Sequence, residues 1–240
     1  MGSAPHLSIV LPVYDECENL AALAAELDVV PALHGAEIVA VDDGSTDGSL
    51  EELRRLARER RHWRVLRLAR HAGQSAALVA GWWAARGDIV VTLDADGQND
   101  PADIPRLLAA LAETAGLVAA VGVRLERADG AWKRVQSRVA NRVRDWVTGH
   151  RVRDTGCTLK AMRRDALLRV PAFDGVHRFL PTLLVRDGGR LVEVPVAHRP
   201  RRHGRTKYGM WNRAARGLRD AFGVRWLNRR RLPPDWDEVT

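Results

Sequence analysis

The sequence predicts an α/β fold built on a mostly parallel, doubly wound sheet flanked by helices. Short apolar runs rich in β-branched residues alternate with longer stretches of helical periodicity through the first half of the chain. These helical stretches are long enough to serve as crossovers between parallel strands. The composition of the 240 residues, 46% apolar and 28% charged, excludes a disordered or fibrous chain.

The elements can be placed in chain order from periodicity and from turn residues. Strands are expected over residues 7–13, 37–41, 65–68, 89–93 and 117–123. Helices are expected over residues 19–30, 47–60, 74–85 and 103–114. Turn and cap residues at 45–48 and 101–103 support two of the helix starts, with Asp47 as the expected N-cap of the second helix.

The second half of the chain is less regular and strongly basic. Residues 1–120 hold 10 basic and 18 acidic residues, a net charge of −8, whereas residues 121–240 hold 28 basic and 12 acidic residues, a net charge of +16. Tryptophans and aliphatic residues recur at helical spacing among arginines over residues 132–146 and 211–226, which predicts two amphipathic basic helices. This half therefore predicts an anionic partner, such as nucleic acid, acidic lipid headgroups or a phosphorylated substrate.

Two compositional signals narrow the class of protein. Cys17 and Cys157 form neither a CxxC pair nor a Cys/His cluster, so a zinc module and a disulfide framework are excluded and a reducing compartment fits best. No apolar run approaches the roughly 20 residues of a membrane-spanning helix. We expect no signal peptide and no membrane span.

Acidic residues follow three of the expected strands. Asp15 and Glu16 follow the first strand, Asp42 and Asp43 end the second, and an Asp-Ala-Asp motif at 94–96 ends the fourth. In a doubly wound sheet, ligands bind beyond the carboxyl ends of the strands. Two adjacent carboxylates such as Asp42 and Asp43 are costly without a metal or a hydrogen-bond donor, and a nucleoside would provide donors.

The Asp-Ala-Asp motif predicts a hard-cation site. Asp94, Asp96 and Gln98 stand at alternate positions after a buried strand, so an extended backbone projects their oxygens to one side. Such oxygens favour Mg²⁺ or Mn²⁺, usually shared with substrate phosphates. The sequence has neither GxGxxG nor GxxxxGK[ST], so dinucleotide-dependent dehydrogenases and P-loop NTPases are disfavoured.

Taken together, four motifs resemble glycosyltransferase family 2. They are PVYDECEN at 12–19, VDDGSTDG at 41–48, RHAGQSA at 70–76 and DADGQNDP at 94–101. Their order and spacing are most similar to the dolichol-phosphate mannosyltransferase-like branch, whose members load a sugar onto a polyprenyl phosphate, and the resemblance spans about residues 5–210. It implies a Rossmann-like GT-A catalytic domain over residues 1–206, with a nucleotide-sugar half at 1–120 and an acceptor half at 121–206. An amphipathic basic segment over 207–240 would follow.

The resemblance also implies roles for individual residues. The nucleotide-sugar site would comprise Pro12, Tyr14, Glu16, Asp42, Gly73, Gln74, Asp94 and Ala95. The metal would be held by Asp94, Asp96 and Gln98. Catalysis would depend on Asp96, Arg124, Arg201 and Lys207, the last two in a basic loop that resembles the family's cover over the diphosphate. The acceptor would meet Lys133, Arg134 and Ser137. Asp15 departs from the family pattern, which commonly has Asn there.

The implied reaction is an inverting transfer from a GDP- or UDP-sugar to a polyprenyl phosphate, dolichyl or undecaprenyl, with Mg²⁺ or Mn²⁺. A lipid monophosphate is mostly dianionic at neutral pH, so it needs no strong general base. Because the acceptor lies in a bilayer, we expect a cytoplasmic protein bound peripherally to the cytoplasmic face of the membrane through its basic helices. A membrane protein is a further expected partner.

Several alternatives stay open at this stage. The two basic helices could instead pack on the catalytic core. The acceptor could be a soluble glycan, a protein or another lipid, and the sugar and base of the donor are undetermined. A nucleic-acid-binding protein would explain the basic half but leaves the strand-end carboxylates without a purpose, so nucleic acid is a disfavoured partner.

Overall fold

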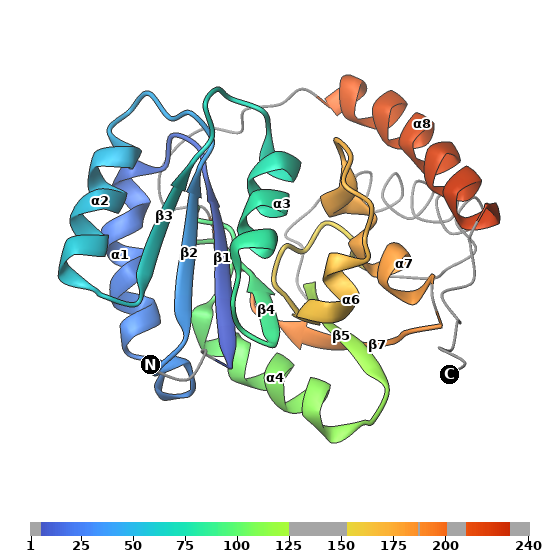
Figure 1. The fold of residues 1–240 in the computed structure, drawn as a ribbon, viewed down its shortest axis with the longest axis horizontal. Helices are drawn as coiled ribbons and strands as arrows, with labels where there is room; N and C mark the ends of the chain where they lie inside the picture. The colour runs from blue at the N-terminus through green and yellow to red at the C-terminus, as the bar shows by residue number, and fades with distance from the viewer. Residues whose placement is uncertain (1–5, 125–152, 187, 201–209, 231–240) are drawn as a thin grey trace, which may run out of the picture. The chain divides into compact units, whose positions relative to one another are not determined.

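A computed structural model describes residues 6–124, 153–186, 188–200 and 210–230, with the side chains of 210–218 left aside (Figure 1). The chain divides into two compact units. One unit comprises residues 1–128 and 153–207, and the other comprises residues 129–152 and 208–240. The sheet and all candidate site residues described below belong to the first unit.

Seven strands form one sheet in the first unit. The order across the sheet is β3-β2-β1-β4-β6-β5-β7. Only β6 runs antiparallel to its neighbours β4 and β5, so the sheet is mostly parallel, as predicted. The bounds are β1 Leu7–Val13, β2 Glu37–Asp42, β3 Trp63–Arg67, β4 Ile89–Thr92, β5 Leu117–Arg124, β6 Lys160–Arg163 and β7 Arg190–Val196.

Helices cover both faces of this sheet. The α-helices of the first unit are α1 Cys17–Asp28, α2 Ser49–Glu59, α3 Gln74–Ala84, α4 Ile104–Glu113, α6 Arg164–Leu168 and α7 Leu180–Val185, and the 3₁₀ turns are η1 Pro31–Leu33, η2 Pro101–Asp103 and η3 Val176–Arg178. The main core joins apolar residues of α1, α2 and α4 to alternate β1 residues such as Ile9 and Leu11. On the other face α3 packs so closely that a Cβ at Gly81 would lie 2.3 Å from a methyl of Val10.

The four helices expected in the first half are confirmed within about two residues, and four of its five strands match closely. The third strand begins two residues earlier than expected, because Trp63 pairs with Ile38 of β2 and is only 4% exposed. The strands β6 and β7 were not expected. β6 is four residues long and begins with a lysine, and it is defined by pairing with β4 and β5 on either side.

The second unit contributes one described helix, α8, over Met210–Arg229. This confirms a helix over residues 211–226. Within its described side chains, Ala221 and Val224 are buried, whereas Phe222 and Trp226 are 53% and 58% exposed. The guanidinium of Arg230 lies 5.4 Å from the ring centre of Trp226. The other expected basic helix, at 132–146, lies outside the described residues.

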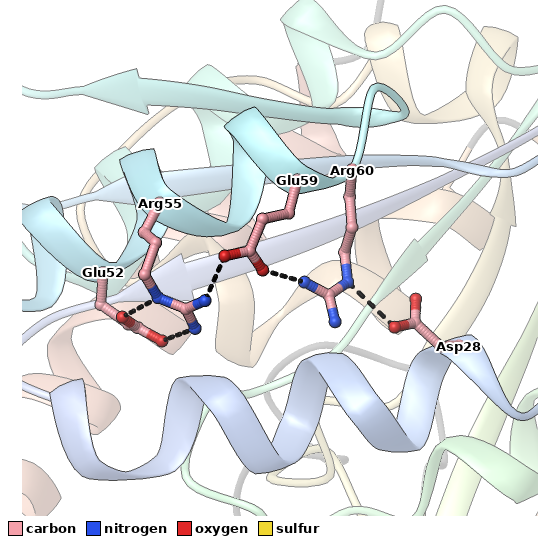
Figure 2. Close-up of polar contacts among 5 residues, drawn as sticks. All are labelled: Asp28, Glu52, Arg55, Glu59 and Arg60. Atoms are coloured by element: carbon pink, nitrogen blue, oxygen red, sulfur yellow. Dashed lines mark hydrogen bonds and ion pairs between the residues drawn. The ribbon is translucent and has the colours of Figure 1, made fainter.

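A chain of ion pairs joins the ends of α1 and α2 (Figure 2). Arg55 pairs with Glu52 and Glu59 on α2, at 2.6 and 2.5 Å. Arg60 follows α2 and pairs with both Glu59, at 3.2 Å, and Asp28 at the end of α1, at 2.9 Å. These pairs are partly exposed, so we expect each to contribute little to the stability of the fold.

Candidate active site

The strand order places a topological switch point at the carboxyl edge of the sheet. The chain moves from β1 outward through β2 and β3 and then returns to place β4 on the other side of β1. Strand order therefore reverses between β1 and β4, which is where open α/β sheets bind ligands. The acidic motifs after β1, β2 and β4 all lie at this edge, as the sequence predicted.

Asp42 and Asp43 have different surroundings although they are adjacent and both buried. The carboxylate of Asp43 accepts hydrogen bonds from the backbone N–H groups of Ala72 (2.7 Å) and Gly73 (2.8 Å), and its Oδ2 lies 2.9 Å from Nδ1 of His71. The expectation that a nucleoside supplies the donors is therefore wrong for Asp43, whose donors belong to the loop before α3. Asp42 Oδ1 accepts from the Ser45 N–H at 3.2 Å, while its buried Oδ2 has no partner among the described residues.

Gly44 allows the loop before α3 to approach this closely. Its φ of +76° lies in the left-handed region, and a Cβ there would stand 2.8 Å from the backbone nitrogen of His71. The His71 ring in turn stacks on Tyr14, with 4.0 Å between ring centroids and 24° between planes. These contacts thus join the segments that follow β1, β2 and β3.

Asp15 joins the β1 and β2 loops. It has a positive φ of 49°, which Asp and Asn tolerate better than most residues. Its Oδ1 accepts from the backbone N–H of Thr46 at 2.7 Å, and its own N–H donates to Ser45 Oγ at 3.0 Å. The Oδ1 of an Asn could accept the same bond from Thr46, so this contact is compatible with either residue. Glu16 is held similarly, through its N–H to Ser49 Oγ and its carboxylate to Asn19.

The centre of the site is the pair Asp94 and Asp96. Gln74, the first residue of α3, donates from Nε2 to Asp94 Oδ1 at 2.9 Å. Burial, followed by the negative charge of Asp96, raises the pKa of Asp94 to about 6, against hydrogen bonds from Thr158 and Gln74 and the charge of Lys160. Asp96 is 7% exposed, and its Oδ1 accepts from the N–H of Gln98 at 3.1 Å.

This donor set fits a divalent hard cation. Asp94, Asp96 and Gln98 offer oxygens only, and a cation would offset the repulsion that raises the Asp94 pKa. Within the described part of the chain, no group of three or more His, Cys, Asp or Glu residues is placed to hold a metal. A cation here would therefore complete its coordination with oxygens from a substrate, as Mg²⁺ commonly does with phosphates.

Two cationic side chains lie near the acidic pair, Lys160, which is buried, and Arg124, which is partly buried. Lys160 at the start of β6 is 2% exposed and donates from Nζ to the carbonyl of Cys157. Its burial lowers its pKa, while the charges of Asp94 and Asp154 act in the opposite direction. Arg124 at the end of β5 makes a two-bond pair with Asp154, Nε to Oδ2 at 2.7 Å and one terminal nitrogen to Oδ1 at 2.9 Å. Asp154 thus fixes the Arg124 guanidinium near the site.

Arg199 ties the end of the β7 segment to the metal motif. Its backbone N–H donates to the carbonyl of Gln98 at 2.9 Å. Its guanidinium pairs with Asp100 and, at 2.8 Å, with Glu26 of α1. Arg199 therefore lies directly beside the Asp94–Gln98 motif.

Apart from Arg124, described above, the expected site residues fall into three groups. Tyr14, Glu16, Asp42, Gln74, Asp94, Asp96 and Gln98 all lie at the carboxyl edge, and Gly73 begins the loop-to-helix turn there with a φ of +90°. Pro12 lies within β1, and Ala95 is 2% exposed in the core, so Ala95 has only its backbone to offer a ligand. The remaining expected residues lie outside the described part of the chain: Arg201, Lys207, Lys133, Arg134 and Ser137.

The structure adds contacts that motif spacing did not indicate. Ser75 and His177 meet at 2.7 Å, although 102 positions separate them. Lys160 at the start of β6 contacts the carbonyl of Cys157, and nothing in the sequence indicated that this lysine is buried. Such contacts depend on tertiary pairing, so periodicity carries no signal for them.

A separate cavity of about 750 Å³ opens at the opposite edge of the sheet. Its lining includes Leu7 and Ile89, the first residues of β1 and β4, with His6, His34 and side chains of α4. Its lining contains no carboxylate, so it does not share the chemistry of the carboxyl-edge site.

Sequence comparisons identify relatives of the chain. A dodecaprenyl-phosphate galacturonate synthase from Rhizobium johnstonii is 36% identical over 234 residues, which cover 95% of this chain and 69% of that protein. An undecaprenyl-phosphate 4-deoxy-4-formamido-L-arabinose transferase from Pseudomonas aeruginosa is 40% identical over 206 residues, 84% of this chain and 60% of that protein. The chain thus spans about 60 to 69% of the length of these relatives.

Structure comparisons agree on the fold. Glucosyl-3-phosphoglycerate synthase from Mycobacterium tuberculosis, solved with Mn²⁺ and UDP, matches with a TM-score of 0.68 at 20% identity over 92% of this chain and 80% of that chain. A Pyrobaculum calidifontis mannosyltransferase, solved with GDP-mannose and Mn²⁺, matches with a TM-score of 0.61 at 21% identity over 80% of this chain and 55% of that chain. The fold is therefore of the GT-A type, as predicted.

The family assignment comes from a match to the family model. The model described as Glycosyl transferase family 2 matches residues 8–170, more than half of the chain. This range includes β1 to β6 and every described carboxylate of the carboxyl edge. The chain belongs to glycosyl transferase family 2.

Proposed function

We propose that this chain transfers a sugar from a nucleotide-sugar donor to the phosphate of a polyprenyl phosphate, with a divalent cation at Asp94 and Asp96. The observation that carries the proposal is the acidic pair at the carboxyl end of β4, where Gln74 contacts Asp94, in a chain of family 2. The named activities of relatives at 36 to 40% identity support the polyprenyl phosphate as acceptor.

Asp42 is the proposed contact for the nucleoside. Its buried Oδ2 lacks a partner among the described residues, and a buried carboxylate oxygen without a donor is costly. An N–H of a nucleobase or a ribose hydroxyl would supply that donor. The stacked rings of Tyr14 and His71 and the loop before α3 would line one side of the same pocket.

Asp94, Asp96 and Gln98 would hold Mg²⁺ or Mn²⁺ against the diphosphate of the donor. The cation would offset the negative charge that develops on the departing nucleoside diphosphate. Arg201 and Lys207 would share this role, and the anchoring of Arg199 at Gln98 supports a place for their segment near the diphosphate.

The acceptor phosphate would act as the nucleophile. One of its oxygens forms a bond to the anomeric carbon while the bond from that carbon to the β-phosphate oxygen breaks, and the electron pair leaves with the nucleoside diphosphate. The attacking phosphate is already ionised, so no strong base is needed. Arg124, oriented by Asp154, would draw the anionic acceptor toward the anionic donor, together with Lys133, Arg134 and Ser137.

We also propose that α8 binds the membrane surface that carries the acceptor. Phe222 and Trp226 stand four residues apart, on one face of the helix, and both are more than half exposed. Arg219 is exposed on the same helix, and Arg230 lies against Trp226. Aromatic residues flanked by arginines are suited to an anionic lipid interface. Among the described residues, no helix is long and apolar enough to span a membrane.

The transfer can be tested directly with the purified chain. It would be incubated with undecaprenyl phosphate, Mg²⁺ or Mn²⁺, and a panel of labelled UDP- and GDP-sugars, and label extracted into organic solvent would be counted. We expect metal-dependent labelling of the lipid by at least one donor. The variant Asp96→Asn should reduce transfer at least a hundredfold, because it removes a charge that holds the cation.

A matched variant separates this effect from a general loss of charge. Asp88→Asn also removes a carboxylate, but Asp88 precedes β4 at the opposite edge of the sheet, and its side chain is 85% exposed. It should retain activity. If a donor is slowly hydrolysed with metal present but the lipid is not labelled, the proposed donor site is supported. The same result would contradict the polyprenyl phosphate as acceptor.

A further inference from the structure

His177 lies at the carboxyl edge although it comes from the acceptor half of the chain. It belongs to η3, and its Nδ1 is 2.7 Å from Oγ of Ser75 in the first turn of α3. The residue before Ser75 is Gln74, whose amide contacts Asp94. One helix end therefore holds the metal carboxylate through Gln74 and His177 through Ser75.

The hydrogen bonds of Ser75 determine which imidazole nitrogen carries the proton. Ser75 is 3% exposed, and its Oγ accepts from the backbone N–H of Gly175 at 2.9 Å. Its own hydroxyl proton needs an acceptor, and among the described residues His177 Nδ1 is the one in reach. Nδ1 is then unprotonated, so the ring proton lies on Nε2, and the one side-chain hydrogen bond of His177 among the described residues is that of Nδ1.

The surroundings of His177 keep its ring uncharged. Burial, followed by the charges of Arg178 and Lys160, lowers the pKa of His177 to about 3. At neutral pH the ring thus offers an N–H donor without a positive charge. Such a donor suits a sugar hydroxyl or ring substituent better than a phosphate, for which a cation is the stronger partner.

We propose that His177 is a donor-recognition residue, whose Nε2–H binds an oxygen substituent of the transferred sugar and whose orientation is set by Ser75. The inference rests on the proposed function, since it requires a nucleotide sugar at Asp94. It assigns to the segment before α7 a part in selecting the sugar, separate from recognition of the nucleoside at Asp42.

Binding measurements without an acceptor test this proposal. The affinities of UDP, GDP, UDP-glucose, UDP-galacturonic acid and GDP-mannose would be measured calorimetrically with Mn²⁺. For the sugar nucleotide that binds the wild-type chain, His177→Phe should weaken binding about tenfold, the loss of one hydrogen bond, while the matching nucleoside diphosphate stays within twofold. His177→Gln, which keeps an N–H donor, should recover most of the affinity.

Two further variants guard against a purely structural effect. Ser75→Ala removes the hydroxyl that orients the ring and should weaken sugar-nucleotide binding in the same selective way, though less. His34→Gln changes a histidine at the opposite edge and should alter neither affinity. If His177→Phe weakens the binding of nucleoside diphosphate and sugar nucleotide equally, or weakens neither, this inference is overturned while the proposed function is unaffected. Failure of the wild-type chain to bind any of the five probes would overturn the proposed function as well.

Discussion

At the scale of single residues, the ionised Asp94 is expected to lower the stability of the metal-free chain, although the same carboxylate is placed to bind a metal. Its pKa of about 6 lies above the usual value of 3.8, so the folded chain holds the proton more tightly than the unfolded chain. Stability from this group is therefore present below pH 3.8 and is lost as pH rises through 6, a cost of up to about 3 kcal/mol. We expect Asp94→Asn to stabilise the metal-free chain at pH 8, although it abolishes transfer.

Urea unfolding in EDTA measures this effect. The advantage of Asp94→Asn over the wild type should be largest at pH 8 and should shrink toward pH 4, where the wild-type carboxyl is protonated in the folded chain and partly protonated in the unfolded chain. Asp88→Asn provides the control, because its exposed side chain should change stability little at either pH. An advantage that does not change with pH would contradict the burial of an ionised Asp94.

His177 predicts the opposite pH dependence. Its pKa is lowered from 6.5 to about 3, so the unfolded chain takes up the proton first as pH falls. The stability from this group is present above pH 6.5 and is lost toward pH 3, at up to about 1.4 kcal/mol per pH unit. As the pH is lowered from 7 to 4.5, the free energy of unfolding measured in urea should fall less steeply for His177→Gln than for the wild type. Parallel curves would refute this.

At the scale of elements, the pair Arg124–Asp154 fixes the end of β5 to the segment before β6. Asp154 is 4% exposed and the Arg124 side chain 19%. We expect Asp154→Ala to lower the free energy of unfolding by about 3 to 5 kcal/mol, because Arg124 is left largely buried without its partner. Asp165→Ala removes the partner of Arg169 in an exposed pair and should cost less than about 1 kcal/mol. Similar losses in both variants would show that burial of the pair is unimportant.

At the scale of the whole molecule, the net charge of +16 in residues 121–240 predicts attraction to anionic surfaces. We expect the chain to sediment with vesicles containing phosphatidylglycerol, less with purely zwitterionic vesicles, and less again in 0.5 M salt. Replacing both Phe222 and Trp226 with Ser should reduce the bound fraction severalfold. Val29→Ser removes a 75% exposed apolar residue that follows α1 and should have no effect. Equal loss in both variants would argue against a specific role for α8.

The sequence alone was sufficient for much of the fold and for the acidic part of the site. Short apolar runs rich in β-branched residues identified β1 to β5, and helical periodicity identified α1 to α4. The runs are continuous because central strands such as β1 and β2 are buried on both faces. Asp42, Asp94 and Asp96 could be located because they follow strands, and parallel strands bring their ends to one edge. The same reasoning missed β6, a four-residue strand whose identity comes from its neighbours in the sheet.

Local patterns by themselves thus determined the α/β class, the carboxyl-edge position of the acidic motifs and, through four motifs, the family. Tertiary structure decided which of those groups are already paired. Asp43 is held by Ala72, Gly73 and His71, whereas Asp42 Oδ2 has no described partner, and His177 meets Ser75 across 102 positions. The physical reason is that hydrogen-bond satisfaction and burial depend on segments distant in the sequence, which residue spacing does not encode.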